Sequence, residues 1–179
     1  MLSIIYILFY MKKLFFTLLA TALCLVSCNK EEAPEAEKVS QLTFDNKKYE
    51  LLDTYCTCSK DIGNYSVSAS IQLSDGYSSV FMVMFDKNVI GKTINQIKGS
   101  TNPFYFRMNG ILPYNGDVIN GGDIFVSNMD GRFESSFKNV DVDITRQDGV
   151  IYVKIDGTLN IGAKITFQTY MNESEIYMY

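Results

Sequence analysis

The chain has 179 residues and a formal net charge of −4, and it contains neither histidine nor tryptophan. The missing histidine excludes catalytic pairs in which a histidine activates a serine or cysteine, and it removes most zinc sites. Two of the 16 basic residues and none of the 20 acidic ones precede Cys28, so the chain from Cys28 onward carries a net charge of −6, which argues against nucleic acid as a partner.

An apolar segment near the N-terminus has the pattern of a bacterial signal peptide. Lys12 and Lys13 form its positive start, and residues 14–26 are apolar apart from two threonines. A run of this length is typical of a secretory signal and is short for a membrane span, which takes about 20 residues. We therefore expect residues 1–27 to be a signal peptide.

Residues 1–10 do not fit this pattern, because they are apolar and uncharged and lie before the lysine pair. We expect Met11 to be the true start of the protein. The alternative is one signal-anchor helix over residues 2–26, which would place both lysines in hydrocarbon at a cost of roughly 2.5 to 3.5 kcal/mol each.

The signal segment ends in Leu25-Val26-Ser27-Cys28, which resembles the lipobox of bacterial lipoproteins. The resemblance implies a diacylglycerol on the thiol of Cys28, cleavage of the peptide bond before it, and acylation of the new amine. Several acyl chains, at about 0.8 kcal/mol per buried CH2, give a stable membrane anchor. The alternative is an ordinary secretory signal in which Cys28 has no role.

The residues after the cysteine are polar and acidic. Because nothing in them could pack, residues 28–38 are expected to be the lipidated cysteine and a flexible tether. Lys30, Glu31 and Glu32 directly after Cys28-Asn29 are similar to the export signal of Bacteroidota-type surface lipoproteins. The resemblance implies a protein anchored in the outer membrane and facing the cell surface. A plain spacer, with the domain facing the periplasm, is the alternative.

Two cysteines remain in the mature chain, Cys56 and Cys58. On a strand they point to the same face, with a Cα separation close to the upper limit for a disulfide. Three alternatives stay open: two small buried thiols, a strained disulfide, or half of a metal site. The metal site is the least favoured because the chain offers no second cysteine pair and no histidine to complete it. We expect neither a metal nor a cofactor.

Residues 39–179 show an apolar period of two and no amphipathic helix. Residues 65–73 alternate apolar side chains with serine and glutamine, which predicts a half-buried strand. Residues 80–85, with the sequence VFMVMF, are apolar throughout, which predicts a central strand covered on both faces. Glycine, proline and asparagine are frequent in residues 86–123, where we expect short strands and long turns.

The clearest local prediction is a β-hairpin over residues 139–157. Asp148 and Gly149 are a favoured pair for a two-residue type I′ loop. With this pair as the loop, the apolar residues of both strands share one face, and Asp143 lies opposite Lys154 on the other face.

A second hairpin through residues 160–162 and an edge strand within residues 174–179 bring the count to nine or ten antiparallel strands in one domain. This count predicts an all-β fold, namely a single antiparallel β-sandwich. The alternative is a closed up-and-down, calycin-like β-barrel. The apolar strand over residues 80–85 is easier to place in a sandwich.

The turn-rich middle of the chain and the long hairpin carry the candidate site residues. Aromatic, arginine and asparagine side chains on loops over a rigid sheet suit a ligand surface, although aromatics can also close the ends of a core. The candidate residues are Tyr105, Arg107, Tyr114, Asn115 and Asp117. A second group, Asp141 and Asp143, could act as paired carboxylates in glycoside hydrolysis, but a solvated strand face with Lys154 opposite explains them better.

These observations lead to the expectation of a membrane-anchored cell-envelope lipoprotein that is not an enzyme. Its domain would bind a partner protein or a saccharide. The alternatives are a lipocalin-like carrier of a small apolar ligand and a hydrolase that depends on carboxylates such as those of Asp117 and Asp141.

Overall fold

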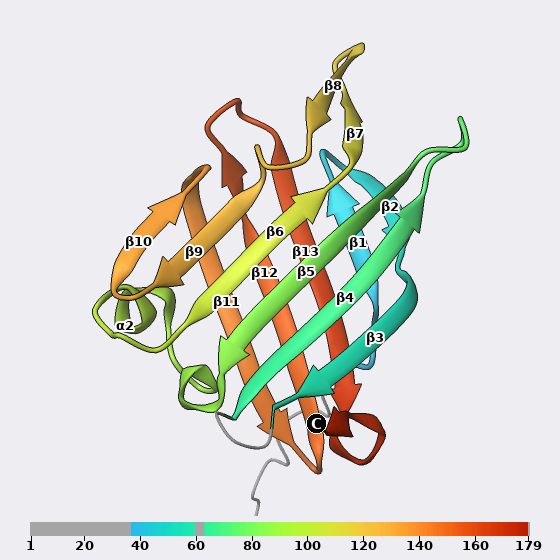
Figure 1. Cartoon of the computed structure of the whole chain (residues 1–179). Helices are drawn as coiled ribbons and strands as arrows, with labels where there is room; N and C mark the ends of the chain where they lie inside the picture. The colour runs from blue at the N-terminus through green and yellow to red at the C-terminus, as the bar shows by residue number, and fades with distance from the viewer. Residues whose placement is uncertain (1–36, 60–62, 179) are drawn as a thin grey trace, which may run out of the picture. The chain divides into compact units, whose positions relative to one another are not determined.

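Strands make up most of the described residues, which are residues 37–59 and 63–178 of a computed structural model. The predicted signal peptide, Cys28 and the Lys30-Glu31-Glu32 segment lie outside them. Within the described part of the chain, no helix is both long and apolar enough to span a membrane. The strands form two large sheets that lie face to face, and Figure 1 shows the larger one in front.

The smaller of the two sheets has five antiparallel strands. In spatial order they are β11 (Phe137–Gln147), β12 (Val150–Leu159), β13 (Lys164–Asn172), β1 (Gln41–Phe44) and β2 (Lys47–Glu50).

The larger sheet has seven strands, and a separate two-stranded hairpin projects beyond it. The spatial order is β10 (Arg132–Ser135), β9 (Phe125–Met129), β6 (Phe104–Asn109), β5 (Ser78–Asp86), β4 (Asn64–Gln72), β3 (Leu52–Cys58) and β14 (Tyr177–Met178). The hairpin consists of β7 (Ile111–Tyr114) and β8 (Asp117–Asn120). All strand pairs in the described chain are antiparallel except β3 with β14.

The predicted all-β sandwich is confirmed by the packing of aromatic side chains between the sheets. Phe81 and Phe106 of the seven-stranded sheet lie against Phe167 of the five-stranded sheet, with ring centroids 5.6 and 5.4 Å away. All three side chains are fully buried, and offset aromatic contacts of this kind stabilise a core beyond the area that they bury. The described strands form separate sheets, whereas the calycin-like alternative would need one closed sheet.

The predicted hairpin is confirmed in its register. Asp148 and Gly149 form the two-residue loop with φ angles of 50° and 74°, as a type I′ turn requires. Asp143 lies directly opposite Lys154. The second hairpin turns as expected between β12 and β13, and the backbone N–H of Leu159 donates to the carbonyl of Ala163 at 2.8 Å.

Other local predictions need correction. The described residues contain 14 strands instead of nine or ten, because several strands have only two to five residues. They also contain one short helix, α2 (Ile94–Lys98), and two 3-10 turns, η1 (Lys87–Val89) and η2 (Glu173–Glu175). The helix α2 begins at a capping box in which the side chains of Thr93 and Gln96 each bond the other residue's backbone, an arrangement that stabilises even a short helix.

Candidate functional site

Strand β5 was expected to be covered on both faces, and the structure corrects this. Phe81, Val83 and Phe85 point into the core and are fully buried. Met82 and Met84 point the other way and remain partly exposed. No described element lies over that side of the sheet (Figure 1). The strand is central in its sheet, but its second apolar face is open in the described part of the molecule.

This outer face of the seven-stranded sheet is built from rows of side chains that the strand register places opposite one another. Hydroxyl, thioether and aromatic side chains dominate the rows. One row contains Ser68, Met82, Arg107 and Phe125, and the next contains Ser66, Met84, Tyr105 and Ser127. Among these side chains Arg107 is the single positively charged one, and the exposed Glu134 of β10 lies next to Ser127 in the second row.

The outer face of the five-stranded sheet has the opposite character. Its two corresponding rows are Asp141, Asp156, Thr166, Thr43, Lys48 and Asp143, Lys154, Gln168, Gln41, Glu50. Both rows contain charged side chains of both signs, as on a face that is in contact with water. The two outer faces of the sandwich therefore differ in chemistry, and only the seven-stranded sheet leaves an apolar surface open.

Two of the five candidate residues, Tyr105 and Arg107, lie on this outer face. Arg107 is exposed, and the structure records no ion pair for it among the described residues. Its Nη2 lies 3.1 Å from the position that a Cβ of Gly122 would take. Glycine at position 122 therefore lets the guanidinium group lie close against the backbone.

The chain leaves the seven-stranded sheet at Gly110, and the other three candidate residues lie beyond this bend. This glycine has a φ of 117°, and a Cβ there would lie 2.8 Å from the carbonyl oxygen of Ser78, so only glycine fits the bend into β7. Asn115 has a φ of 52° in the β7–β8 turn, which gives it a role in the turn. The ring of Tyr114 meets that of Phe44 edge-on at 5.8 Å and so helps to close one end of the core, the alternative that the sequence left open.

Asp117 and Tyr114 line a cleft of about 520 Å³ at this end of the sandwich. The cleft lies between the β7–β8 hairpin and the β12–β13 turn, where Ile161 is 55% exposed. The carboxylate of Asp117 accepts a hydrogen bond from the backbone N–H of Val118 at 2.8 Å. The five candidate residues thus do not form one site: two lie on the sheet face, two line this cleft, and one shapes a turn.

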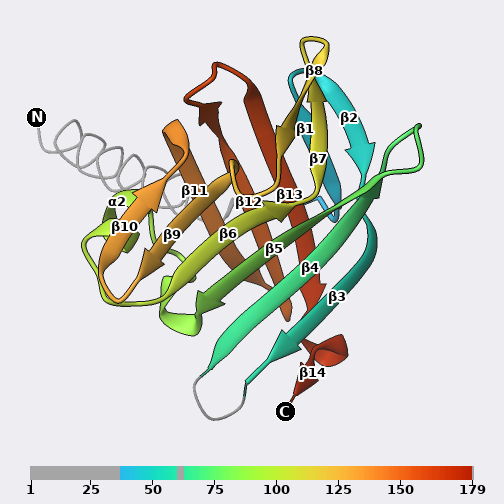
Figure 2. The same ribbon diagram turned by 45° about the horizontal axis from the view of Figure 1, so that its top comes forward.

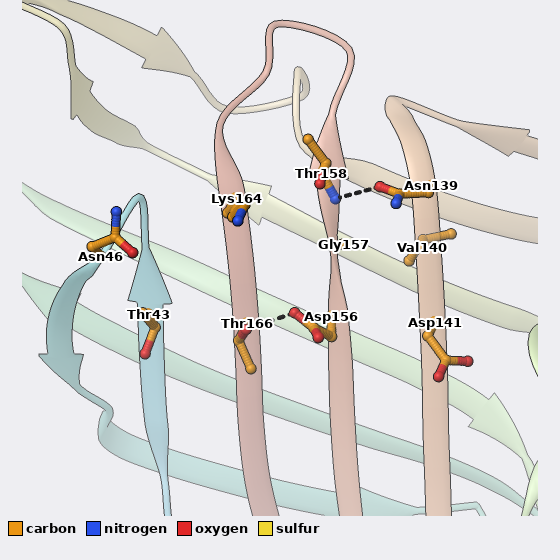
Figure 3. Close-up of a pocket in the computed structure, with 10 residues that line it drawn as sticks. All are labelled: Thr43, Asn46, Asn139, Val140, Asp141, Asp156, Gly157, Thr158, Lys164 and Thr166. Carbon is orange, nitrogen blue, oxygen red and sulfur yellow. Dashed lines mark hydrogen bonds between the residues drawn. The ribbon is translucent and has the colours of Figure 1, made fainter.

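A second cleft of about 450 Å³ lies on the charged outer face and contains Asp141 (Figure 3). The direct cross-strand neighbour of Asp141 is Asp156. The Oδ1 of Asp156 accepts a hydrogen bond from Thr166 Oγ1 at 2.7 Å. In Figure 3 the carboxylate of Asp156 points toward Thr166, and that of Asp141 points away from both. The two carboxylates do not converge on one point, as paired catalytic acids must.

A third cleft, of about 400 Å³, lies beside β3 and β14. It is lined by tyrosines from three strands, Tyr55, Tyr170 and Tyr177, together with Cys56 and Glu175. None of these tyrosines was a candidate from the sequence, because β3, β13 and β14 meet only in the folded chain.

Cys56 and Cys58 are free thiols in the structure, with Cys58 buried and Cys56 half-buried. Burial, and to a smaller extent the negative charge of Glu175, raise the pKa of Cys56 to about 11. Burial likewise raises the pKa of Cys58. In the described ranges, no three His, Cys, Asp or Glu side chains gather closely enough to hold a metal ion.

No family model matches this chain, and no curated protein or solved structure is significantly similar to it. The feature of this chain that points most directly to a function is the difference in chemistry between the two outer faces of the sandwich.

Proposed function

We propose that this protein is a membrane-anchored cell-envelope lipoprotein whose β-sandwich is a non-enzymatic binding module. Its binding surface is the outer face of the seven-stranded sheet, and its partner is another protein. The observation that carries the proposal is the open apolar face on β5, where two partly exposed methionines alternate with fully buried core residues.

The composition of this face suits a protein partner. Contiguous apolar surface on a soluble domain marks an interaction site, and methionine and aromatic residues with arginine are enriched in such interfaces. Methionine side chains also adapt to the shape of a partner. Since Arg107 is the single positive charge in the two central rows, the partner's surface is apolar with a carboxylate opposite Arg107. A saccharide is less favoured here, because thioethers and not aromatic rings occupy the centre of the face.

The anchor supports the same function. Lipid on Cys28 and a tether to residue 38 would hold the domain at the outer membrane without a spanning segment. The export signal Lys30-Glu31-Glu32 supports a domain on the cell surface, with the periplasmic side as the alternative. A binding module gains from such an anchor because attachment to a surface raises its effective concentration near a partner on that surface.

The two alternative functions have less support from the geometry. A hydrolase would need converging carboxylates. Asp143 lies opposite Lys154, and Asp141 points away from its cross-strand neighbour Asp156. A lipocalin-like carrier would need an open apolar cavity, and Phe81, Phe106 and Phe167 fill the space between the sheets.

Site-specific photo-crosslinking in intact cells tests the proposal. A photo-reactive residue replaces Met84 on the proposed face, and the matched control replaces Gln168, which is partly exposed at the centre of the opposite face. The proposal expects a discrete protein adduct from position 84 and none from position 168. Equal adducts from both positions, or none from position 84, would contradict it.

A further inference from the structure

The third cleft is formed where the C-terminal segment folds back over the edge of the sandwich. Ile176 is 7% exposed and fixes this segment to the core. The next residue, Tyr177, pairs in parallel register with Thr57 of β3. Figure 2 shows β14 beside the end of β3. The buried isoleucine therefore positions its two neighbours, Glu175 and Tyr177, in the wall of the cleft.

The aromatic side chains come from both sheets. Tyr55 lies two residues before Thr57, so it shares a sheet face with Tyr177. The two tyrosines are 60% and 61% exposed. Tyr170 reaches the cleft from β13 of the other sheet. A cleft of about 400 Å³ lies within the range of small-ligand sites, and two of the three tyrosines that line it are mostly exposed.

The charge that lines the cleft is negative. Glu175 is the single charged residue among the described residues that line it, and no lysine or arginine does so. The Nδ2 of Asn172 donates to Glu175 Oε2 at 2.8 Å, which holds the carboxylate in place and leaves it capacity to accept further bonds. The raised pKa of Cys56, caused by burial and then by Glu175, agrees with a negative potential in the cleft.

We infer that this cleft binds a small organic cation that carries an alkylated ammonium group. Tyrosine rings attract such cations through their faces, most strongly where water is partly excluded, and the Glu175 carboxylate adds an opposite charge. Anionic ligands, including nucleotides, are disfavoured because nothing in the lining balances their charge. A neutral saccharide would gain nothing from Glu175. This inference goes beyond the binding of a partner protein and does not depend on it.

The test compares choline with its neutral isostere 3,3-dimethyl-1-butanol by calorimetry. The mature lipidated protein is used in a polyoxyethylene detergent, which has no ammonium group of its own. Since the two probes differ in charge and not in shape, we expect choline to bind about tenfold more tightly. Equal affinities for the two probes, or binding of the neutral probe alone, would overturn the inference.

Matched variants locate the binding. Tyr177→Leu and Glu175→Gln should each weaken choline binding by about three- to tenfold, whereas Tyr177→Phe keeps the ring and should change little. Tyr77→Leu is the control, because Tyr77 is 59% exposed and lies outside the cleft. Tyr177 is equally exposed, so its loss should leave the fold intact, and Glu175→Gln gives an independent second measurement. Unchanged choline binding in both variants would refute the site.

Discussion

Asp143 lies directly opposite Lys154 across the β11–β12 pair. This relationship depends on the loop of Asp148 and Gly149, both of which have a positive φ. A shift of one residue would bring Tyr152 opposite Ile144 and set the apolar residues of one strand against the polar residues of the other. The loop therefore keeps the charged side chains of β11 and β12 together on the outer face of the five-stranded sheet.

The first prediction concerns this loop. Gly149→Val should lower the free energy of unfolding by about 1 kcal/mol or more, because a β-branched residue resists the φ of 74°. Chemical denaturation measures the effect. Gly99→Ala is the control, since Gly99 has a φ of −84° and a Cβ there would make ordinary contacts. If the midpoint of Gly149→Val matched that of the wild type, the loop would not need its glycine.

The hairpin could be predicted from the sequence because its information is local. The turn pair and the alternation of its strands are adjacent in the chain. The capping box of Thr93 and Gln96 is equally local, and the T-x-x-Q pattern could have indicated α2.

The binding surfaces could not be predicted in the same way. The sequence of an apolar strand such as β5 has the same pattern whether its second face is covered or open, because the elements that cover it come from distant parts of the chain. The tyrosine cleft joins Tyr55 to Tyr177 through a parallel pair between distant segments. The five candidate residues were separated by the bend at Gly110, whose close approach to Ser78 exists only in the folded chain.

The second prediction follows from the raised pKa of Cys56. Its thiolate forms only as the pH rises toward about 11, because its pKa lies above the ordinary value of 9.0. Alkylation of Cys56 by iodoacetamide in a Cys58→Ser background should therefore be slow at pH 8 in the folded protein and should accelerate up to about pH 11. Since the folded pKa is the higher one, its contribution to stability is present below pH 9 and is lost between pH 9 and 11.

Urea-unfolded protein is the control for Cys56, and it should react fast at pH 8. Equal rates in folded and unfolded protein would contradict the burial of the thiol. If wild-type protein without reductant contained no free thiol at all, the disulfide alternative would return.

The third prediction concerns the anchor. Cys28→Ser should leave an uncleaved precursor without lipid, because serine cannot form the thioether. Metabolic labelling with a fatty acid measures this, and Cys24→Ser is the control that should keep its label. A label that persisted in Cys28→Ser would exclude this cysteine as the attachment site.

The fourth prediction concerns the side of the outer membrane. Replacement of Lys30, Glu31 and Glu32 by alanine should leave lipidation and folding unchanged, because a solvated tether contributes nothing to the core. It should protect the domain from protease added to whole cells. Equal cleavage of variant and wild type would reduce these three residues to a spacer.

The most direct test of the proposed function is charge reversal within the crosslinking experiment. With the photo-reactive residue at position 84, Arg107→Glu reverses the single positive charge in the central rows of the proposed face, and Lys154→Glu makes the same change on the opposite face. Because a reversed charge repels the partner's carboxylate, the adduct yield on intact cells should fall about tenfold for Arg107→Glu and stay unchanged for Lys154→Glu. Equal yields in the two variants would contradict the assignment of the seven-stranded sheet as the binding surface.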